Sequence, residues 1–179
     1  NKKGRHGIVH CQITNPRILQ GMKDQDLLAY IQPVFIDLDM NTVEPAIGAQ
    51  RMDKVYAWKS MLDMGIHTSG GSDAPVVSFD AMENIYFAVT RKNISGQPQE
   101  GWIPSEKISV DEAVKLFTKN AAYASYTEDE NGTIEVGKNA DFVVLEKNIY
   151  EIDPDEIKAT KVDMTVLDGE IVYEREVEE

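Results

Sequence analysis

The sequence predicts an α/β protein with a parallel sheet, followed by a small β-rich module. Two observations predict this class. Strand-like and helix-like patterns alternate over the first two-thirds of the 179 residues, as they do in βα units. After about residue 127 helical periodicity disappears, and short apolar runs separated by Gly, Asn and Asp take over. We therefore divide the chain into residues 1–127 and residues 128–179.

Capping signals and hydrophobic periodicity predict the elements of the first part. Asn15 followed by Pro16 is typical of a helix start. Ser109 with Glu112 forms the pattern of a capping box at another start. Apolar runs bounded by turn residues indicate strands. The predicted strands are residues 8–10, 28–36 (interrupted at Pro33) and 66–69, and the predicted helices are the one opening at Pro16 and residues 53–64, 79–89 and 109–121.

Residues 128–179 are predicted to form short strands. Residues 132–137 lie between two glycines and predict one strand, and the apolar run at residues 142–145 predicts a buried one. Apolar and polar residues alternate on both sides of Asp168 and Gly169, which is a strong signal for a two-residue hairpin turn. A small β-module therefore closes the chain.

Composition excludes several function classes. Hydrophobic residues make up 42% and charged residues 27%, a globular balance. The net charge of −13 argues against a nucleic-acid or anionic-membrane partner, because both require clustered Lys and Arg. The single cysteine, Cys11, excludes an intrachain disulfide and fits a reducing compartment. No apolar run approaches the ~18 residues that span a bilayer, and no signal peptide is visible, so we expect a cytoplasmic protein.

The most informative turn is GGSDAP at residues 70–75. Gly70 and Gly71 allow backbone angles closed to other residues, and Pro75 fixes φ just beyond Asp73. A carboxylate displayed directly after a strand can hold a metal or move a proton. The alternative is an Asx-turn, in which Asp73 only accepts hydrogen bonds from nearby backbone N–H groups.

His10 is the second candidate, because functional side chains emerge at the carboxyl ends of parallel strands. A neutral imidazole there can bind a divalent metal through one nitrogen while a neighbouring acceptor holds the other. The alternative is a histidine that only bonds a neighbouring loop. Cys11 should face the other side of the strand as a small buried hydrophobe. His6 and His67 lack a spaced partner, and we interpret both as structural.

Separate motifs in this order resemble the metal-dependent amidohydrolase superfamily, most closely the branch that includes N-substituted formamide deformylase. In the first part they are RHGIVHCQ at 5–12, QPVF at 32–35, GAQR at 48–51, YAW at 56–58 and GSDAPV at 71–76. In the second they are TKNAA at 118–122, GTIEVGKNADFVVL at 132–145 and VLDGEIVY at 166–173. The resemblance covers nearly the whole chain.

The resemblance implies the C-terminal portion of a TIM-like (β/α)8 barrel, about strands six to eight, followed by a small β-sandwich. It implies that His10 is a metal ligand and that Asp73 both touches the metal and shuttles protons. The implied cofactor is a divalent metal, zinc, with one or two ions in the full-length enzyme. The implied reaction is hydrolysis of C–N bonds in a small amide-like substrate by metal-activated water. Arg51 and Gln32 are weaker candidates for substrate binding, and Trp58 for the pocket.

Other ligands of the family's metal site are missing from the sequence, namely the first-strand His-x-His pair, the bridging ligand and the fifth-strand His. We therefore expect a C-terminal fragment of a longer enzyme that neither binds metal stoichiometrically nor hydrolyses amides by itself, and that self-associates through apolar surface. Two alternatives stay open. One is a deaminase of the same superfamily, and the other is a non-catalytic, barrel-derived binding module.

Overall fold

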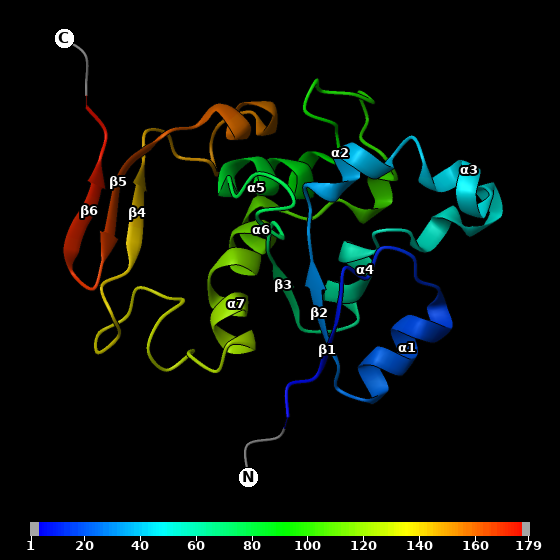
Figure 1. Ribbon diagram of the computed structural model, residues 1–179, viewed down its shortest axis with the longest axis horizontal. Helices are drawn as coiled ribbons and strands as arrows, with labels where there is room; N and C mark the ends of the chain where they lie inside the picture. The colour runs from blue at the N-terminus through cyan, green and yellow to red at the C-terminus, as the bar shows by residue number, and fades with distance from the viewer. Residues whose placement is uncertain (1–3, 177–179) are drawn as a thin grey trace.

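The first sheet holds the candidate site. The computed structural model describes residues 4–176. Three parallel strands lie in the order β1–β2–β3, with Ala29 of β2 paired to Ile8 on one side and Thr68 on the other (Figure 1). They are β1 (Gly7–Val9), β2 (Leu28–Ile31) and β3 (Thr68–Gly70). Because all three strands run in the same direction, their carboxyl ends meet at one edge of the sheet. The predicted parallel sheet of βα units is confirmed.

Helices lie on both sides of this sheet, and their starts follow the predicted caps. Asn15 accepts a hydrogen bond from the N–H of Ile18 at the start of α1, and Ser109 and Glu112 form the capping box of α6. In Figure 1, α5, α6 and α7 lie on one side of the strands, and α1 and α4 on the other. These helices are α1 (Pro16–Asp24), α4 (Trp58–Asp63), α5 (Ala81–Thr90), α6 (Val110–Phe117) and α7 (Lys119–Ala124).

The predicted strand at residues 28–36 is wrong in its second half. β2 ends at Ile31, and the chain turns at Pro33 into the short helix α2 (Phe35–Asp39). The N–H of Phe35 donates to Gln32 O at 3.1 Å, which closes this turn. Proline has no N–H to give to a sheet and pre-sets a turn conformation, so the apolar residues beyond it form a helix rather than a strand.

Two predicted helices are shorter than expected. Residues 49–54 form a 3-10 turn, η1 (Ala49–Lys54), and Val55 then forms an antiparallel bridge with Ile13 before α4 begins. The prediction of one helix over residues 53–64 missed this bridge, because its partner is 42 positions away.

The helix predicted at 109–121 breaks at Thr118, whose φ of −122° and ψ of −99° separate α6 from α7. A further short helix, α3 (Val43–Ile47), was not predicted. The helix predicted from Phe79 begins at Ala81, and Phe79 is exposed.

The hydrophobic core lies between the parallel sheet and its helices. Cys11 is buried in it, as predicted, and Trp58 is fully buried rather than lining a pocket. Arg91, at the end of α5, is also fully buried. Its Nε donates to Trp102 O at 2.6 Å and its Nη1 to Tyr56 O at 2.9 Å, while the guanidinium lies 4.6 Å from the centroid of the Trp58 ring. Arg91 thus joins α5 to the loop before α4.

The second sheet is antiparallel, with three strands in the order β4–β5–β6. They are β4 (Phe142–Leu145), β5 (Val162–Leu167) and β6 (Glu170–Glu174). The predicted hairpin turn is confirmed, since Asp168 and Gly169 have φ of 50° and 80°. The strand predicted at 132–137 is absent: turns and bends occupy these positions. β4 exists, but three of its four side chains are exposed rather than buried, with 51% of Val143 accessible, and only Leu145 is half-buried. Within residues 4–176 this sheet has no second layer of strands.

The 3-10 helix η3 (Pro154–Ala159) connects the second sheet to the first part of the molecule. It packs along α5, and its Ile157 is fully buried in the common core. Lys92 forms an ion pair with Asp155 at 2.7 Å, and Lys158 donates to Ile94 O at 2.6 Å. Figure 1 shows the β4–β6 sheet beyond α5–α7, on the far side from β1–β3. No helix among residues 4–176 has the length and apolar character needed to cross a membrane.

Candidate functional site

Three of the predicted residues follow the carboxyl ends of the three parallel strands. His10 comes directly after β1, Gln32 directly after β2, and Asp73 three residues after β3. The sequence therefore brings these side chains to the same edge of the sheet. This edge is where parallel α/β proteins bind ligands, which makes it the candidate site.

His10 is held from two sides by the segment that follows β2. Its Nδ1 lies 2.8 Å from Gln32 Oε1, and its ring stacks on Phe35 with centroids 5.7 Å apart and planes at 26°. Gln32 Nε2 faces Tyr30 O at 3.5 Å, which orients the amide so that its oxygen points to His10. An amide oxygen only accepts hydrogen bonds, so Nδ1 carries the proton and Nε2 keeps its lone pair. His10 itself has a φ of 70° and donates its backbone N–H to Tyr30 O at 2.8 Å.

Asp73 lies on an exposed turn with a φ of 61°. Its backbone carbonyl accepts the N–H of Val76 at 2.9 Å, which closes the turn. Its carboxylate accepts no hydrogen bond from any residue within 4–176, so the side chain does not form the Asx-turn that was the alternative. The carboxylate is therefore free to contact a ligand.

Arg51 does not join this group. It lies on η1, is exposed, and donates from Nη1 to Ile47 O at 2.6 Å in its own loop. His67 lies at the opposite end of β3, where its Nε2 is 2.9 Å from Asn120 O and its ring contacts Tyr123. Burial lowers the pKa of His67, which fits the structural role expected for it. Across the described part of the chain, no three His, Cys, Asp or Glu side chains gather closely enough to hold a metal.

A polar cluster next to His10 was not predicted. Gln12 Nε2 donates to Asp39 Oδ2 at 3.0 Å and to the Tyr56 hydroxyl at 2.8 Å, and that hydroxyl donates to the same carboxylate oxygen. Burial, followed by the Asp39 carboxylate, raises the pKa of Tyr56, so its hydroxyl stays protonated. The cluster joins the loop after β1, the end of α2 and the segment before α4. Only the position of Gln12, two residues after His10, signals it in the sequence.

Another polar residue at this edge was also missed. Asn84, on α5, is 1% exposed, and its Oδ1 accepts the backbone N–H of Val34 at 3.2 Å. Val34 lies between Gln32 and Phe35, the two residues that hold His10. No local signal marks Asn84, because an asparagine inside an amphipathic helix usually faces solvent.

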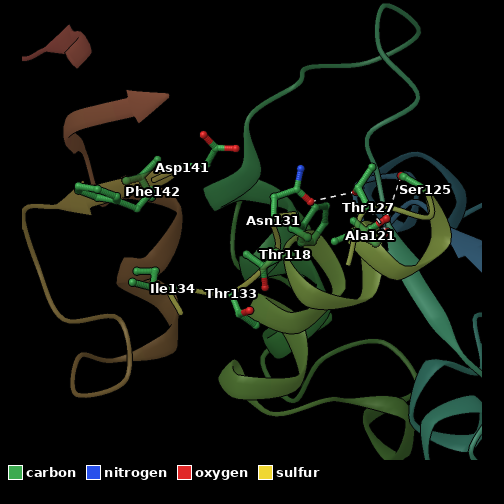
Figure 2. Close-up of a pocket in the computed structure, with 13 residues that line it drawn as sticks. Thr118, Ala121, Ser125, Thr127, Asn131, Thr133, Ile134, Asp141 and Phe142 are labelled. Atoms are coloured by element: carbon green, nitrogen blue, oxygen red, sulfur yellow. Dashed lines mark hydrogen bonds between the residues drawn. The ribbon is translucent and has the colours of Figure 1, made fainter. Parts of the chain in front are cut away.

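A large hollow lies elsewhere, between α6–α7 and the chain that leads to β4 (Figure 2). It has a volume of about 490 Å³ and a mixed polar and apolar lining. Figure 2 shows Thr127 and Asn131 on one wall, joined by a hydrogen bond of 2.9 Å, with Ile134 and Phe142 across from them. None of the residues at the carboxyl edge of the parallel sheet lines this hollow. This hollow is therefore separate from the candidate site.

Comparison with protein families and curated proteins gives consistent matches. A model described as the amidohydrolase family matches residues 1–173. The protein YtcJ of Bacillus subtilis, which carries an amidohydrolase name, is 35% identical over 175 residues, covering 97% of this chain and 33% of that protein. N-substituted formamide deformylase of Arthrobacter pascens is 36% identical over 122 residues, covering 68% of this chain and 22% of that protein. The chain thus spans about a third or less of the length of these relatives.

Solved structures show the same fold. A metal-dependent hydrolase from Pyrococcus horikoshii matches with a TM-score of 0.73 at 20% identity, over 83% of this chain and 30% of that chain. A mutant atrazine chlorohydrolase from Arthrobacter aurescens, complexed with zinc and atraton, matches with a TM-score of 0.64 at 17% identity, over 94% of this chain and 36% of that chain. At these identities the likeness establishes the fold alone.

Proposed function

Because this chain belongs to the amidohydrolase family, we propose that it forms part of a metal-dependent hydrolase that cleaves C–N bonds in small amide-like substrates. One observation carries this proposal. His10 is held through Nδ1 by Gln32, which leaves Nε2 to bind a metal at the edge where the Asp73 carboxylate is also exposed.

The residues present fit a part of a metal site. His10 Nε2 and an Asp73 carboxylate oxygen are both common ligands of divalent metals such as zinc. A catalytic zinc takes about three protein ligands, and residues 4–176 bring together no group of three. We therefore infer that further ligands come from outside the described residues, and that one or two ions bind in the complete protein. The chain also covers only 33% of the related protein YtcJ. Together with the missing metal ligands, this coverage supports the inference that the chain is the C-terminal part of a longer enzyme.

The mechanism assigns a separate task to each residue. A bound divalent metal lowers the pKa of water toward neutrality and polarises a carbonyl. His10 presents Nε2 to the site in one orientation, because Gln32 fixes the tautomer of the imidazole ring and Phe35 fixes the plane of that ring. Asp73 takes the proton from the attacking water and delivers it to the leaving nitrogen, which an exposed, unbonded carboxylate can do in both directions. Gln32 supports His10, and Arg51, whose Nη1 donates to Ile47 O, is a candidate for substrate binding.

The same proposal extends to the architecture. We infer that residues 1–127 supply about strands six to eight of a (β/α)8 barrel, with β1, β2 and β3 in those places, and that residues 128–179 form part of a β-sandwich. The parallel order β1–β2–β3 and the separate antiparallel sheet support this division. Exposed apolar side chains, including Val9 on β1 and Ile171 on β6, support self-association of the 179-residue chain. Size-exclusion chromatography that returns a clean monomer would count against it.

The decisive experiment compares the 179-residue chain with the full-length enzyme. The isolated chain should retain no stoichiometric zinc after dialysis and should not hydrolyse formamides. In the full-length enzyme, Asp73→Asn should reduce kcat by about 10²-fold or more, the range typical of a general acid–base residue. Asp129→Asn, another exposed aspartate far from the carboxyl edge of the sheet, should leave kcat unchanged. Wild-type kcat in Asp73→Asn would remove Asp73 from the mechanism.

The same assays separate the alternatives. Release of ammonia from a heterocyclic amine, without hydrolysis of formamides, would identify a deaminase. A full-length protein that binds no metal and turns over neither substrate class would identify a non-catalytic binding module.

A further inference from the structure

The buried amide of Asn84 connects α5 to the segment that holds His10. We propose that Asn84 is a positioning residue for His10: by fixing the backbone of residues 32–35, it keeps the His10 ring in the tautomer that leaves Nε2 free. This inference rests on the proposed function for its catalytic meaning. Its test depends on neither metal nor substrate.

Both ends of the Asn84 amide are occupied by backbone groups. Oδ1 accepts the N–H of Val34 at 3.2 Å, and Nδ2 donates to Asp80 O at 2.9 Å. Reversing the amide would bring two donors together at Val34 and two acceptors together at Asp80, so the orientation is fixed. With 1% of its surface exposed, Asn84 cannot exchange these partners for water without opening the core.

Val34, which Asn84 binds, lies between the two residues that contact the His10 ring. Val34 precedes α2, and its backbone N–H donates to Asn84 Oδ1. Gln32, two residues before Val34, accepts from His10 Nδ1, and Phe35, one residue after Val34, stacks on the His10 ring. A shift of the Val34 backbone would move both supports at once.

The other end of the amide leads toward Asp73. Asp80 caps α5, since its carboxylate accepts the N–H groups of Met82 and Glu83. The loop that ends at Asp80 is the one that carries Asp73 after β3. Asn84 thus ties together the two loops that carry Asp73 and the His10 supports. A residue needed only for core packing would be served as well by an apolar side chain, which would avoid burying two polar groups.

The experiment measures the tautomer of neutral His10 by nitrogen-15 NMR on the metal-free 179-residue chain, at a pH where the ring is uncharged. The chain has three histidines, so assignment by a His10→Gln variant is direct. The wild type should show the Nδ1–H form. Asn84→Leu should shift the ratio toward the Nε2–H form about fivefold, the change that loss of one ordinary hydrogen bond makes in an equilibrium constant.

Two further variants make the result decisive. Thr90→Val removes a different buried polar group from α5, the Thr90 hydroxyl, which donates to Tyr86 O. This variant should leave the tautomer ratio unchanged at a similar loss of stability. Asn84→Asp keeps an oxygen facing Val34, and because burial holds its carboxyl in the neutral form, the hydroxyl still donates to Asp80 O. The tautomer ratio of this variant should therefore stay within about twofold of the wild-type ratio. The inference is overturned if Asn84→Leu unfolds at the same urea concentration as Thr90→Val but keeps the wild-type ratio. It is also overturned if Asn84→Asp shifts the ratio fivefold, which remains measurable should Asn84→Leu fail to fold.

Discussion

Replacing Arg91 by methionine tests how a fully buried cation is tolerated in this core. Methionine has nearly the length of the arginine stem, so the substitution removes the guanidinium while leaving little empty space. Two hydrogen bonds are lost, from Nε to Trp102 O at 2.6 Å and from Nη1 to Tyr56 O at 2.9 Å. Hydrogen bonds to charged groups contribute about 1.5–3 kcal/mol each, so this loss is roughly 3–6 kcal/mol.

An opposing effect reduces that loss. Burial lowers the pKa of Arg91 to about 10, which corresponds to roughly 3 kcal/mol of cost for keeping the charge in the core. Nη2 adds to this cost, since it has no hydrogen-bond partner among residues 4–176. The substitution relieves both. The two effects nearly offset each other, and Arg91→Met should lower the free energy of unfolding by only about 1–3 kcal/mol.

Urea unfolding followed by tryptophan fluorescence measures this directly, because both tryptophans of the chain contact the guanidinium. Arg17→Met on the exposed face of α1 is the matched control and should change stability by less than about 0.5 kcal/mol. A loss of about 5 kcal/mol or more in Arg91→Met would refute the reasoning. It would mean that Arg91 behaves as one partner of a buried ion pair, whose removal leaves the other charge uncompensated.

Three other predictions concern a titration, two turns and a cap. Because burial lowers the pKa of His67 below 6.5, the unfolded chain binds more protons than the folded one in this range, so the free energy of unfolding should fall as the pH drops below 6.5. Urea titrations at about pH 7.5 and about pH 5 should show this fall, and His67→Gln should reduce it; an unchanged pH dependence would assign the effect to other groups. Gly101 and Gly169 both have φ of 80°, but a Cβ at Gly101 would lie 2.3 Å from Thr90 O, whereas one at Gly169 meets nothing closer than 4.0 Å. In thermal unfolding, Gly169→Ala should therefore lower the free energy of unfolding by about 1 kcal/mol, and Gly101→Ala should lower it by at least about 3 kcal/mol. Equal losses in the two variants would show that the predicted clash at Gly101 does not occur. Ser109→Ala should lower the free energy of unfolding by about 1 kcal/mol, because it removes the capping box of α6, whereas Ser95→Ala in an exposed loop should leave it unchanged. An unchanged free energy of unfolding in Ser109→Ala would show that the cap contributes nothing to stability.

Local signals in the sequence predict the fold where a few neighbouring residues decide the structure. The cap at Asn15, the box at Ser109 and the turn at Asp168 and Gly169 depend on contacts within four residues, and all three are confirmed. The helix at 53–64 failed because Val55 pairs with a distant residue, Ile13. The run at 142–145 was expected to be buried because four apolar residues in sequence usually lie between two layers, and residues 4–176 supply only one.

The candidate site was predictable to a similar extent. Placement of His10 and Asp73 after parallel strands follows from the strand pattern and chain order alone. The support of His10 by Gln32 and Phe35 does not, because it depends on how the turn after β2 folds back. The role of Asn84 could not be predicted for a different reason. Its hydrogen-bond partners are backbone groups, which every residue has, so no residue type in the sequence indicates these contacts.

The packing of η3 against α5 has a consequence for how related sequences can diverge. Lys92 and Asp155 are 63 positions apart yet form one ion pair, and Lys158 lies over the Tyr86 ring at 4.4 Å. A substitution on either side leaves an unpaired charge beside a buried surface, so each is tolerated best when its partner changes as well. Positions 92 and 155 should therefore co-vary among homologues, and chimaeras that exchange residues 128–179 between distant relatives should fold poorly unless residues 81–94 are exchanged with them.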